Sequence, residues 1–462
     1  MMEKVVVNST SSANDVVDVS KPIDGHTFSI GWLLDSLRSN DKTYQKLLGD
    51  KAVKDVSAKD ISDGKDSLRS NDKTYQKLHG DKAVKDVSAK DISDGKGFAS
   101  NVLRCVITFV DSGEDSYSTI LKIPFFNTFN KSQNEQKFID LHNSEVDFFE
   151  SLASIAEAPT PKVFKTVRWQ PDAGNKEGCI HMEDLSGKRK NISYFENINL
   201  SQVKCVIKHL AKIHKNILCA DPTLWKGKYL KNQESFVDFL DMFDPIIEPH
   251  LKKCKIEDQL RPLVEKYHSF SVSKEFCLYA FKQSYKDLNI PPVLVHGDLH
   301  FNNILWATDK NGDVKNEICA FVDWQTIQEG SPMSDLARFL VNCCDGVVRR
   351  QAEEMAFEFY LESEEMAFEF YLECLTKEFG GDSKKVPYTI EQLKTAYNYA
   401  FLTQCFFIIG LPDFFLGMSK ITDEKVKEAH FDFGVSKTLH AYQDADRLLQ
   451  GEMKDVFEKY GK

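Results

Sequence analysis

The segment Val295–Trp306 constrains the fold and function of this chain more than any other segment does. An apolar run leads into a loop in which an aspartate and an asparagine lie five positions apart. These residues are Asp298 and Asn303. A second apolar run, Ile318–Val322, leads into Asp323, which lies 20 residues past Asn303. In phosphoryl transfer one carboxylate orients and deprotonates a hydroxyl, while an amide and a second carboxylate bind Mg²⁺ against the ATP phosphates. The segment therefore predicts a kinase site, with Asp298 as the base and Asn303 and Asp323 as metal ligands.

The order of the loop residues makes this prediction more specific than any one residue does. His296, Asp298 and Asn303 follow the pattern His-x-Asp-x-x-x-x-Asn of the kinase catalytic loop. We expect His296 to tether the loop, whereas the sequence leaves open whether His300 faces the substrate. Asp335 stands in the first turn of a predicted helix, where the helix dipole favours a carboxylate. It is predicted to support the loop and not to catalyse.

Composition and charge narrow the class of protein. With 42% hydrophobic and 28% charged residues the chain has the composition of an ordinary globular protein, and its net charge of −11 argues against nucleic-acid binding. Eleven cysteines without a CxxC pair indicate free thiols in a reducing compartment. Residues Met1–Ser12 lack the apolar core of a signal peptide. The apolar stretch Ala400–Pro412 is interrupted by Thr403 and Gln404 and is too short to span a bilayer. We expect a cytoplasmic protein without a membrane partner; its oligomeric state is left open.

Two internal duplications interrupt the chain. Residues 35–65 recur as 66–96 with a single difference, Leu48 against His79. Residues 353–363 recur as 364–374, also with a single difference, Ser363 against Cys374. Two near-identical copies are too few for a solenoid. Inserting 11 residues adds close to three turns to a helix, so a helix could lengthen by roughly 16 Å without losing its buried face.

The longer duplication is predicted to displace one of its copies. Only the second copy runs on into the glycine turn Asp94–Ser100. The first copy is therefore expected to be the surface excursion.

The N-terminal half predicts a β-hairpin that could cover a nucleotide. Gly95 and Gly97 precede an alternating run, Val102–Val110, and a charged turn leads to a second run, Tyr117–Pro124. The two glycines are candidates for nucleotide binding. The signal is weak, because the third glycine of GxGxxG and the Gly-Lys-Ser/Thr of a Walker A loop are missing. An ordinary strand-entry turn is the alternative.

Lys122, near the end of the second run, is predicted to reach the α and β phosphates, as the strand lysine of protein kinases does. A solvated lysine at a strand end is the alternative. Such a lysine needs a carboxylate partner from the following helical stretch, 134–153. Glu145 is the first choice because an apolar stripe accompanies it, and Glu150 is the second.

A short predicted strand at Gly178–Leu185 ends in an acidic turn, where Met182 and Glu183 would offer backbone groups to adenine. A plain strand end is the alternative. The C-terminal half follows helical spacing, beginning at Ser201–Lys215 with Ser201 as the expected N-cap. Its aromatic stretches, 355–379 and 390–409, more often form core than a pocket.

Several of these motifs together resemble one family. They are His296–Trp306, Asp323–Gln325, Ser331–Arg338, Asp94–Ser100 and Met182–Leu185. With them the chain resembles the ecdysteroid kinase-like, or CHK kinase-like, family, in its nematode branch, which is related to choline kinases and aminoglycoside phosphotransferases.

The resemblance implies an α+β, protein-kinase-like bilobal fold. A tail (1–22) would precede a β-rich N-lobe (23–185) and a mostly helical C-lobe (186–462). It also implies ATP and Mg²⁺ as cofactors and a small-molecule hydroxyl as acceptor. By the family's pattern Asp298 is the base, Asn303 and Asp323 bind Mg²⁺, and Lys122 with Glu145 positions the phosphates.

Two functions stay open. The first is a small-molecule kinase whose acceptor is a steroid-like alcohol, a glycosylated xenobiotic or an amino alcohol, with an apolar alcohol favoured. The sequence has no Ala-Pro-Glu mark of a protein-kinase activation segment, which argues against a protein substrate. The second is a non-catalytic binding protein that keeps the kinase fold.

Overall fold

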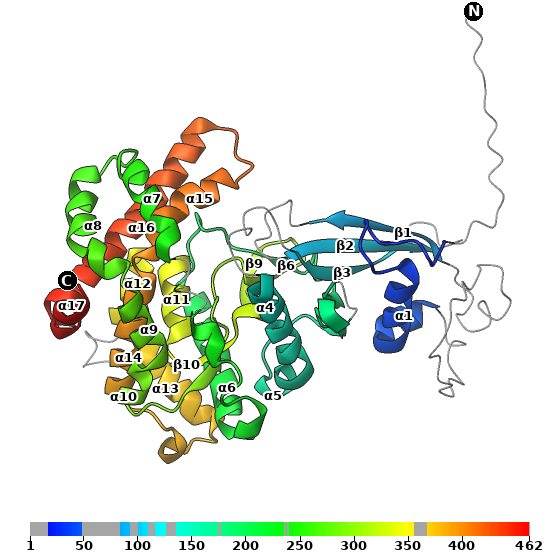
Figure 1. Cartoon of the computed structure of the whole chain (residues 1–462), viewed down its shortest axis with the longest axis horizontal. Coiled ribbons are helices and arrows are strands. Elements are labelled where there is room, and N and C mark those ends of the chain that lie inside the picture. The colour runs from blue at the N-terminus through cyan, green and yellow to red at the C-terminus, as the bar shows by residue number, and fades with distance from the viewer. Residues whose placement is uncertain are drawn as a thin grey trace, which may run out of the picture. The chain divides into compact units, whose positions relative to one another are not determined.

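The structure is a computed structural model (Figure 1). It describes residues 17–48, 84–92, 100–109, 116–125, 135–173, 177–234, 237, 240–354 and 367–461. Contacts within the chain divide it into two compact units: Met1–His142 with Lys162–Asp184, and Asn143–Pro161 with Leu185–Lys462. The first unit is built on a β-sheet and the second is mostly helical. The predicted α+β fold, with a β-rich N-terminal part and a helical C-terminal part, is confirmed.

The first unit contains a five-stranded antiparallel sheet in the order β1-β2-β3-β5-β4. Its strands are β1 (Val84–Asp91), β2 (Ser100–Phe109), β3 (Ser116–Pro124), β4 (Val163–Val167) and β5 (Cys179–Glu183). The predicted hairpin is present as β2 and β3, with Leu103 opposite Leu121. Strand β1 was not predicted from the sequence.

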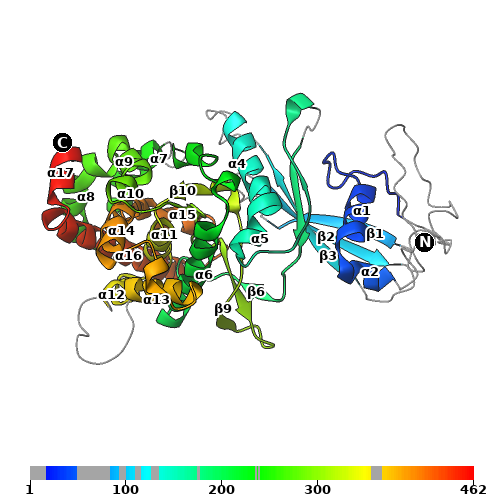
Figure 2. The same ribbon diagram turned by 90° about the horizontal axis from the view of Figure 1, so that it is seen from below.

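Two helices cover this sheet on one side (Figure 2). Helix α1 (Ile30–Asn40) begins at Ser29, whose side chain accepts a hydrogen bond from the Trp32 backbone N–H, and α2 (Lys42–Leu48) follows. Leu33, Leu34, Leu37 and Tyr44 are fully buried with strand residues such as Leu103 and Cys105. Apolar burial of this kind is what holds a short helix on a sheet.

The long duplication is used in a way the sequence did not predict. Helices α1 and α2 take residues 35–48 from the first copy, whereas β1 takes Val84–Asp91 from the second. The expectation that the whole first copy is displaced is therefore wrong. Covalent continuity is the reason, because α1 begins in unique sequence at Ile30 and runs on into the first copy. Residues 49–83, and Gly95 and Gly97 of the predicted glycine turn, lie outside the described residues.

The second unit begins with the end of α4 (Glu135–Asp147), a π-helical turn (Phe148–Leu152) and α5 (Ala153–Ala156). The long helix α6 (Leu200–Cys219) begins at Asn199, which forms a capping box with Gln202, so the predicted N-cap at Ser201 is wrong. The capping box satisfies N–H groups that a helix start otherwise leaves unpaired.

The remaining α-helices in the described part of this unit are α7 (Leu240–Leu251), α8 (Glu257–Ser271), α9 (Lys274–Lys282), α10 (Ser284–Asp287), α11 (Ser334–Cys343), α12 (Gly346–Glu354), α13 (Ala367–Glu378), α14 (Ile390–Gln404), α15 (Leu411–Gly417), α16 (Glu424–Gln450) and α17 (Lys454–Tyr460). Its strands are short: β6 (Arg189–Lys190), β8 (Ile304–Thr308) and β9 (Val314–Phe321) form one sheet, and β7 (Val293–Val295) pairs with β10 (Gln328–Gly330). Residues 355–366 lie outside the described residues, so the expected single lengthened helix stays a prediction.

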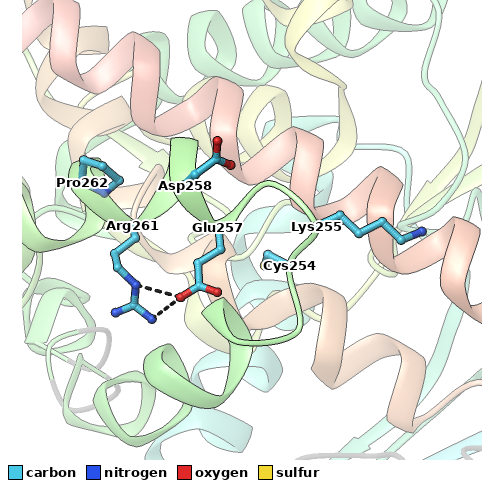
Figure 3. A pocket seen from close by; sticks show the side chains of 6 residues that line it. All are labelled: Cys254, Lys255, Glu257, Asp258, Arg261 and Pro262. Atoms are coloured by element: carbon cyan, nitrogen blue, oxygen red, sulfur yellow. Dashed lines mark hydrogen bonds and ion pairs between the residues drawn. The ribbon is translucent and has the colours of Figure 1, made fainter.

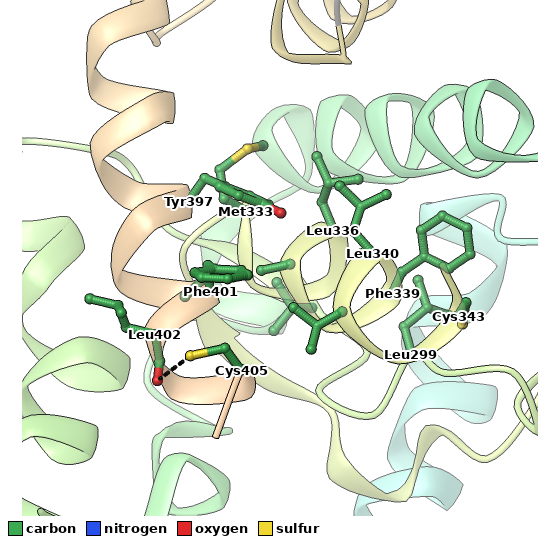
Figure 4. Packing of buried hydrophobic residues seen from close by; sticks show 14 of the residues in the cluster. Leu299, Met333, Leu336, Phe339, Leu340, Cys343, Tyr397, Phe401, Leu402 and Cys405 are labelled. Atoms are coloured by element: carbon green, nitrogen blue, oxygen red, sulfur yellow. Dashed lines mark hydrogen bonds between the residues drawn. The ribbon is translucent and has the colours of Figure 1, made fainter. Parts of the chain in front are cut away.

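The core of the second unit packs α11 against α14 and against the loop after β7 (Figure 4). Leu299 of that loop is fully buried, as are Leu336 and Leu340 of α11, while Tyr397 and Phe401 of α14 are nearly so. Tyr397 and Phe401 of α14 are therefore core, as expected for this aromatic stretch. By length and composition, the stretch Ile390–Gly417 passes the test for a membrane-crossing helix, but 61% of its most apolar window is buried in the protein, as in a core helix.

Candidate active site

The predicted catalytic loop begins at the end of β7 and is held by α11. Asp335, in the first turn of α11, accepts a hydrogen bond from the backbone N–H of His296 (2.7 Å) and another from that of Gly297 (2.9 Å). Thr326 donates its hydroxyl to the carbonyl of His296 (3.0 Å). The carboxylate thus ties the loop to a rigid helix, which is the supporting role that the sequence predicted for Asp335.

Gly297 is at a position where no other residue fits without movement. Its φ is +80°, and a Cβ there would lie 2.3 Å from the carbonyl oxygen of Thr326. Glycine adopts such a φ at no steric cost. The carbonyl of Thr326 can therefore lie this close to residue 297 only because glycine has no side chain.

His296 is buried and links the loop to the second predicted strand. Its Nε2 lies 2.9 Å from the carbonyl oxygen of Val322, and its Nδ1 lies 3.2 Å from the backbone nitrogen of Asp298. A carbonyl only accepts and an N–H only donates, so the neutral ring with hydrogen on Nε2 satisfies both. Burial lowers the pKa of His296, which favours this neutral form. The histidine tethers the loop, and its ring nitrogens are both engaged in doing so.

Asp298 is held by three side chains. Arg338 donates from Nε (2.9 Å) and from Nη2 to Oδ1 of Asp298, while Asn303 Nδ2 lies 3.2 Å and His300 Nε2 lies 3.4 Å from Oδ2. Burial by itself raises the pKa of Asp298, but the charge of Arg338 and the nearby His300 hold that pKa well below its usual range. The carboxylate is therefore an anion in the neutral pH range.

Asn303 and Asp323 are brought together by the hairpin β8–β9. Ile304 pairs with Phe321 across the two strands, and the Val322 N–H donates to the Asn303 carbonyl (3.0 Å). Asp323 follows with φ 70° and ψ 57°, in the left-handed region. For a residue other than glycine such a conformation costs about 1–3 kcal/mol of conformational free energy, and strained residues of this kind cluster at functional sites.

The two residues fit a magnesium ion by their chemistry. The Asn303 Nδ2 group donates to the Asp298 carbonyl (2.9 Å) and carboxylate, so the Oδ1 atom is the end of the amide that can coordinate a cation. Asp323 supplies a carboxylate. Among the described residues no group of three or more His, Cys, Asp or Glu side chains could hold a metal. In phosphoryl-transfer sites Mg²⁺ is bound by one or two carboxylates together with substrate phosphates, so binding of the ion by Asn303 and Asp323 stays a prediction that their chemistry allows.

Glu145 lies next to this turn in the same unit. It is 1% exposed, and its Oε1 accepts a hydrogen bond from the backbone N–H of Trp324 (3.2 Å). The Trp324 ring stacks on Phe148 of the π-helical turn, with ring centroids 3.9 Å apart. Glu150, the second choice, is exposed. Glu145 thus supports the residue that follows Asp323, while its pairing with Lys122 stays a prediction.

Lys122 belongs to the first unit and is buried at 8% exposure. It lies on β3, opposite Val102 of β2 and Ile180 of β5. This position in the interior of the sheet disagrees with the alternative of a solvated lysine. Burial, and to a lesser extent the positive charge of Lys122, lower the pKa of His142 to about 4.

Met182 and Glu183 end strand β5, as the predicted adenine contact requires. The Met182 carbonyl accepts a hydrogen bond from Thr119 Oγ1 (2.8 Å), and the Glu183 N–H donates to the Lys162 carbonyl (2.9 Å). These two backbone groups are therefore already bonded within the sheet. The contact of Met182 and Glu183 with adenine stays a prediction.

The sequence reasoning missed two residues of the site, Arg338 and Gln404. Arg338 was part of a recognised motif without a role, and Gln404 was noted only as an interruption of an apolar stretch. A polar side chain in an otherwise buried apolar helix is the signal that could have found Gln404, because buried polar groups need partners.

A surface hollow of about 480 Å³ lies elsewhere, at the start of α8, and none of the candidate residues line it (Figure 3). It is lined by Cys254, Lys255, Glu257, Asp258, Arg261 and Pro262. Arg261 is engaged by the carboxylates of Glu257 and Glu248, and burial raises the pKa of Cys254 to about 11. The thiol is therefore protonated and unreactive at neutral pH.

Comparison with known proteins places the chain in a family. A family model described as "Uncharacterized oxidoreductase dhs-27" (DUF1679) matches residues 65–447. The chain belongs to this family.

Two proteins with similar sequences come from Caenorhabditis elegans. The protein "Uncharacterized oxidoreductase dhs-27" is 26% identical over 348 residues, which are 72% of this chain and 40% of that protein. "Uncharacterized kinase-like protein D1044.1" is 25% identical over 276 residues, 59% of this chain and 65% of that protein. The chain thus spans less than two thirds of either relative. The predicted resemblance to a kinase-like nematode family is confirmed.

Solved structures of phosphotransferases are also similar. Choline kinase from Cryptosporidium parvum has a TM-score of 0.40 at 14% identity, and covers 81% of this chain and 94% of its own. The ADP-bound aminoglycoside phosphotransferase APH(2'')-Ib has a TM-score of 0.35 at 12% identity. The match covers 78% of this chain and 95% of that protein.

Proposed function

We propose that this protein is an ATP- and Mg²⁺-dependent small-molecule kinase that transfers the γ-phosphate to the hydroxyl of a small alcohol. One observation carries the proposal. Asn303 is hydrogen-bonded to Asp298 through its side chain and to Val322 through its backbone, so one residue joins the proposed base to the residue before Asp323. All of these contacts lie within the second unit.

The arrangement suits a hydroxyl acceptor. The hydroxyl proton passes to Asp298 as the hydroxyl oxygen bonds to the γ-phosphorus and the bond from that phosphorus to the β-phosphate oxygen breaks, which releases ADP. The transition state of such a transfer is loose, so positioning and charge matter more than the strength of the base. An aspartate held as an anion by Arg338 meets this need. Asn303 and Asp323 would hold Mg²⁺, which neutralises charge on the phosphates.

The acceptor is proposed to be a bulky or apolar alcohol, steroid-like or a glycosylated xenobiotic. Tyr397 and Phe401 of α14 do not support this, because they are core. Support comes instead from aromatic rings beside the catalytic loop. His300 contacts Phe301 (5.1 Å between centroids), Phe301 contacts Phe415 (4.8 Å), and Phe415 contacts Phe414, which is 54% exposed.

The alternative is a non-catalytic kinase-like binding protein that retains the fold. The two duplications favour it, because the longer one lies beside the predicted glycine turn. The intact hydrogen bonds among Asp298, Asn303 and Val322 favour the enzyme. The oxidoreductase name belongs to a protein of which this chain spans 40%, and it is not carried over. A cytoplasmic location is proposed as well, and the eleven cysteines, all free thiols, support it.

The melting temperature with and without Mg-ATP tests the proposal. A ligand at 100 times its dissociation constant stabilises a protein by about 2.7 kcal/mol. We expect a magnesium-dependent rise that Asp323→Ala removes. The matched control is Asp313→Ala, at an exposed position on the same β8–β9 hairpin, which should keep the rise. A panel of steroid, glycoside and amino alcohols is then screened for ADP release. No melting shift in the folded wild type, or a shift without turnover of any alcohol, would favour the binding protein.

A further inference from the structure

Arg338 makes a directed contact with the proposed base. Its side chain is 20% exposed and comes from α11, and its Nε and Nη2 both donate to Oδ1 of Asp298. Its Nη1 donates to Oε1 of Gln404 at 2.7 Å. The guanidinium is therefore held at two edges, one by the catalytic loop and one by α14.

Gln404, which accepts this hydrogen bond, is a buried polar residue in the core of the second unit. It is the last residue of α14, is 4% exposed, and its Nε2 donates to the hydroxyl of Thr403 (3.1 Å). A buried amide without partners would cost about 1–3 kcal/mol. The two polar residues that interrupt the apolar stretch Ala400–Pro412 thus satisfy each other, and Gln404 also fixes Arg338.

The contact makes the two carboxylate oxygens of Asp298 different. Oδ1 carries both hydrogen bonds from Arg338, whereas the contacts of Oδ2 are with Asn303 Nδ2 and His300 Nε2, at the longer distances of 3.2 and 3.4 Å. We propose that Arg338, held in place by Gln404, is a positioning residue for phosphoryl transfer: it fixes Oδ1 and leaves Oδ2 as the oxygen that meets the acceptor hydroxyl. This inference rests on the proposed kinase function.

The chemistry of arginine explains why this residue type is needed. A guanidinium is planar and holds its donors in a rigid fork, whereas lysine is a flexible point charge. Lysine at this position could keep the charge but could not bind Asp298 and Gln404 with one fixed group. A displacement of about 1 Å at a reacting group can cost roughly 100-fold in rate, so the orientation of the carboxylate matters as much as its charge.

The inference is tested by the turnover of three variants, Arg338→Met, Arg338→Lys and Gln404→Leu. Each is assayed with ATP and with either an alcohol from the screen or water as the acceptor. For Arg338→Met we expect kcat to fall about 100-fold with the KM for Mg-ATP within about twofold of wild type, because nucleotide binding is untouched. Arg338→Lys and Gln404→Leu should each lose about 10-fold in kcat by the same argument. Millimolar ethylguanidinium should restore part of the turnover of Arg338→Ala, which a merely structural role would not allow.

Arg261→Met is the matched control, because Arg261 also binds carboxylates on a helix but lies outside the site. It should keep the wild-type kcat. The melting shift with Mg-ATP shows for each variant that the nucleotide site is folded. Should Arg338→Met fail to fold, Arg338→Lys and Gln404→Leu decide the question, and wild-type kcat in both would overturn the inference.

The outcomes separate the two proposals. Wild-type kcat in Arg338→Met, with an inactive Asp298→Asn, would overturn the role of Arg338 and leave the kinase function standing. Absence of any ATP turnover by folded wild-type protein would overturn the kinase function, and with it the role of Arg338.

Discussion

Asn303 donates its side-chain amide to both the backbone carbonyl (2.9 Å) and the carboxylate (3.2 Å) of Asp298. The five-residue spacing of these residues in the sequence therefore closes a hydrogen-bonded loop. The contact orients the amide, since only its nitrogen can donate. One residue thereby contacts the proposed base through its amide nitrogen, and its side-chain oxygen Oδ1 is the atom that could coordinate the proposed metal ion.

Asp298→Asn should abolish ATP turnover while sparing ATP binding. The amide keeps the shape of the side chain but cannot take the hydroxyl proton, and Asp298 is not among the proposed magnesium ligands. Turnover and the Mg-ATP melting shift are measured on the same preparation. Equal turnover by wild type and variant would remove Asp298 from the role of base.

Gly297→Ala should destabilise the protein far more than Gly312→Ala. Both glycines have φ near +80°, at +80° and +85°, but a Cβ at Gly297 meets the Thr326 carbonyl at 2.3 Å, whereas nothing lies within 4 Å of one at Gly312. Both variants pay for the backbone conformation, and overpacking adds typically 1–3 kcal/mol at Gly297 alone. Chemical denaturation of the two variants gives the comparison. Equal losses would mean that the loop moves freely away from residue 326.

Substitution of a buried residue in either copy of the long duplication should destabilise the protein. Leu37 is buried in the first copy and Val87 in the second. Leu37→Ala should cost about 2–5 kcal/mol, and Val87→Ala should also destabilise, because each leaves a cavity. Leu224→Ala and Val347→Ala, at exposed positions, are the controls and should be near neutral. A loss in Leu37→Ala no larger than that in Leu224→Ala would contradict the burial of the first copy in α1.

Deletion of residues 49–79 should leave the fold intact, because it removes only the segment between α2 and β1. This deletion removes one full copy of the duplication. The resulting chain is identical to one that lacks residues 35–65, except that it keeps Leu48 where the other chain keeps His79. Soluble expression and melting temperature check this. Insoluble protein, or a lower melting temperature than that of the full chain, would show that the extra copy supports the fold.

His181 should make the first unit sensitive to acid. Burial lowers its pKa to about 3; the nearby Asp41 acts in the opposite direction and Lys165 in the same one. Thr119 uses its hydrogen on the Met182 carbonyl, so His181 Nε2 donates to Thr119 (2.8 Å) and Nδ1 accepts from Ser36 (2.7 Å). The ring is thus neutral in the folded state.

A lowered histidine pKa contributes stability that is present above the unfolded pKa of about 6.5 and is lost as the pH falls below it. Wild type should therefore lose stability against His181→Gln between pH 6.5 and about pH 3, by at most about 1.4 kcal/mol per pH unit. Urea denaturation of both proteins across this range gives the difference. A constant difference between them would mean that His181 does not set the acid limit.

Much of the fold and of the site followed from local sequence. The β2–β3 hairpin and the loop from His296 to Asn303 depend on neighbours within a few residues, and alternation or spacing reports those neighbours. The helix cap at Asn199 was missed because Ser201 is an equally good capping residue, and the capping box with Gln202 decides between them.

The sequence by itself determined which groups could perform phosphoryl transfer, because Asp298, Asn303 and Asp323 lie on short connections after apolar runs whose spacing is readable. Only the tertiary structure decided what surrounds them. Arg338 lies 40 residues from Asp298 and 66 from Gln404, and their contact depends on how α11 and α14 pack. The same holds for the duplication, where two copies have nearly equal local propensities. Continuity with the unique sequence on either side decided which described residues form these elements, because α1 begins in unique sequence at Ile30 and runs on into the first copy, while β1 of the second copy pairs with β2 in the unique sequence that follows.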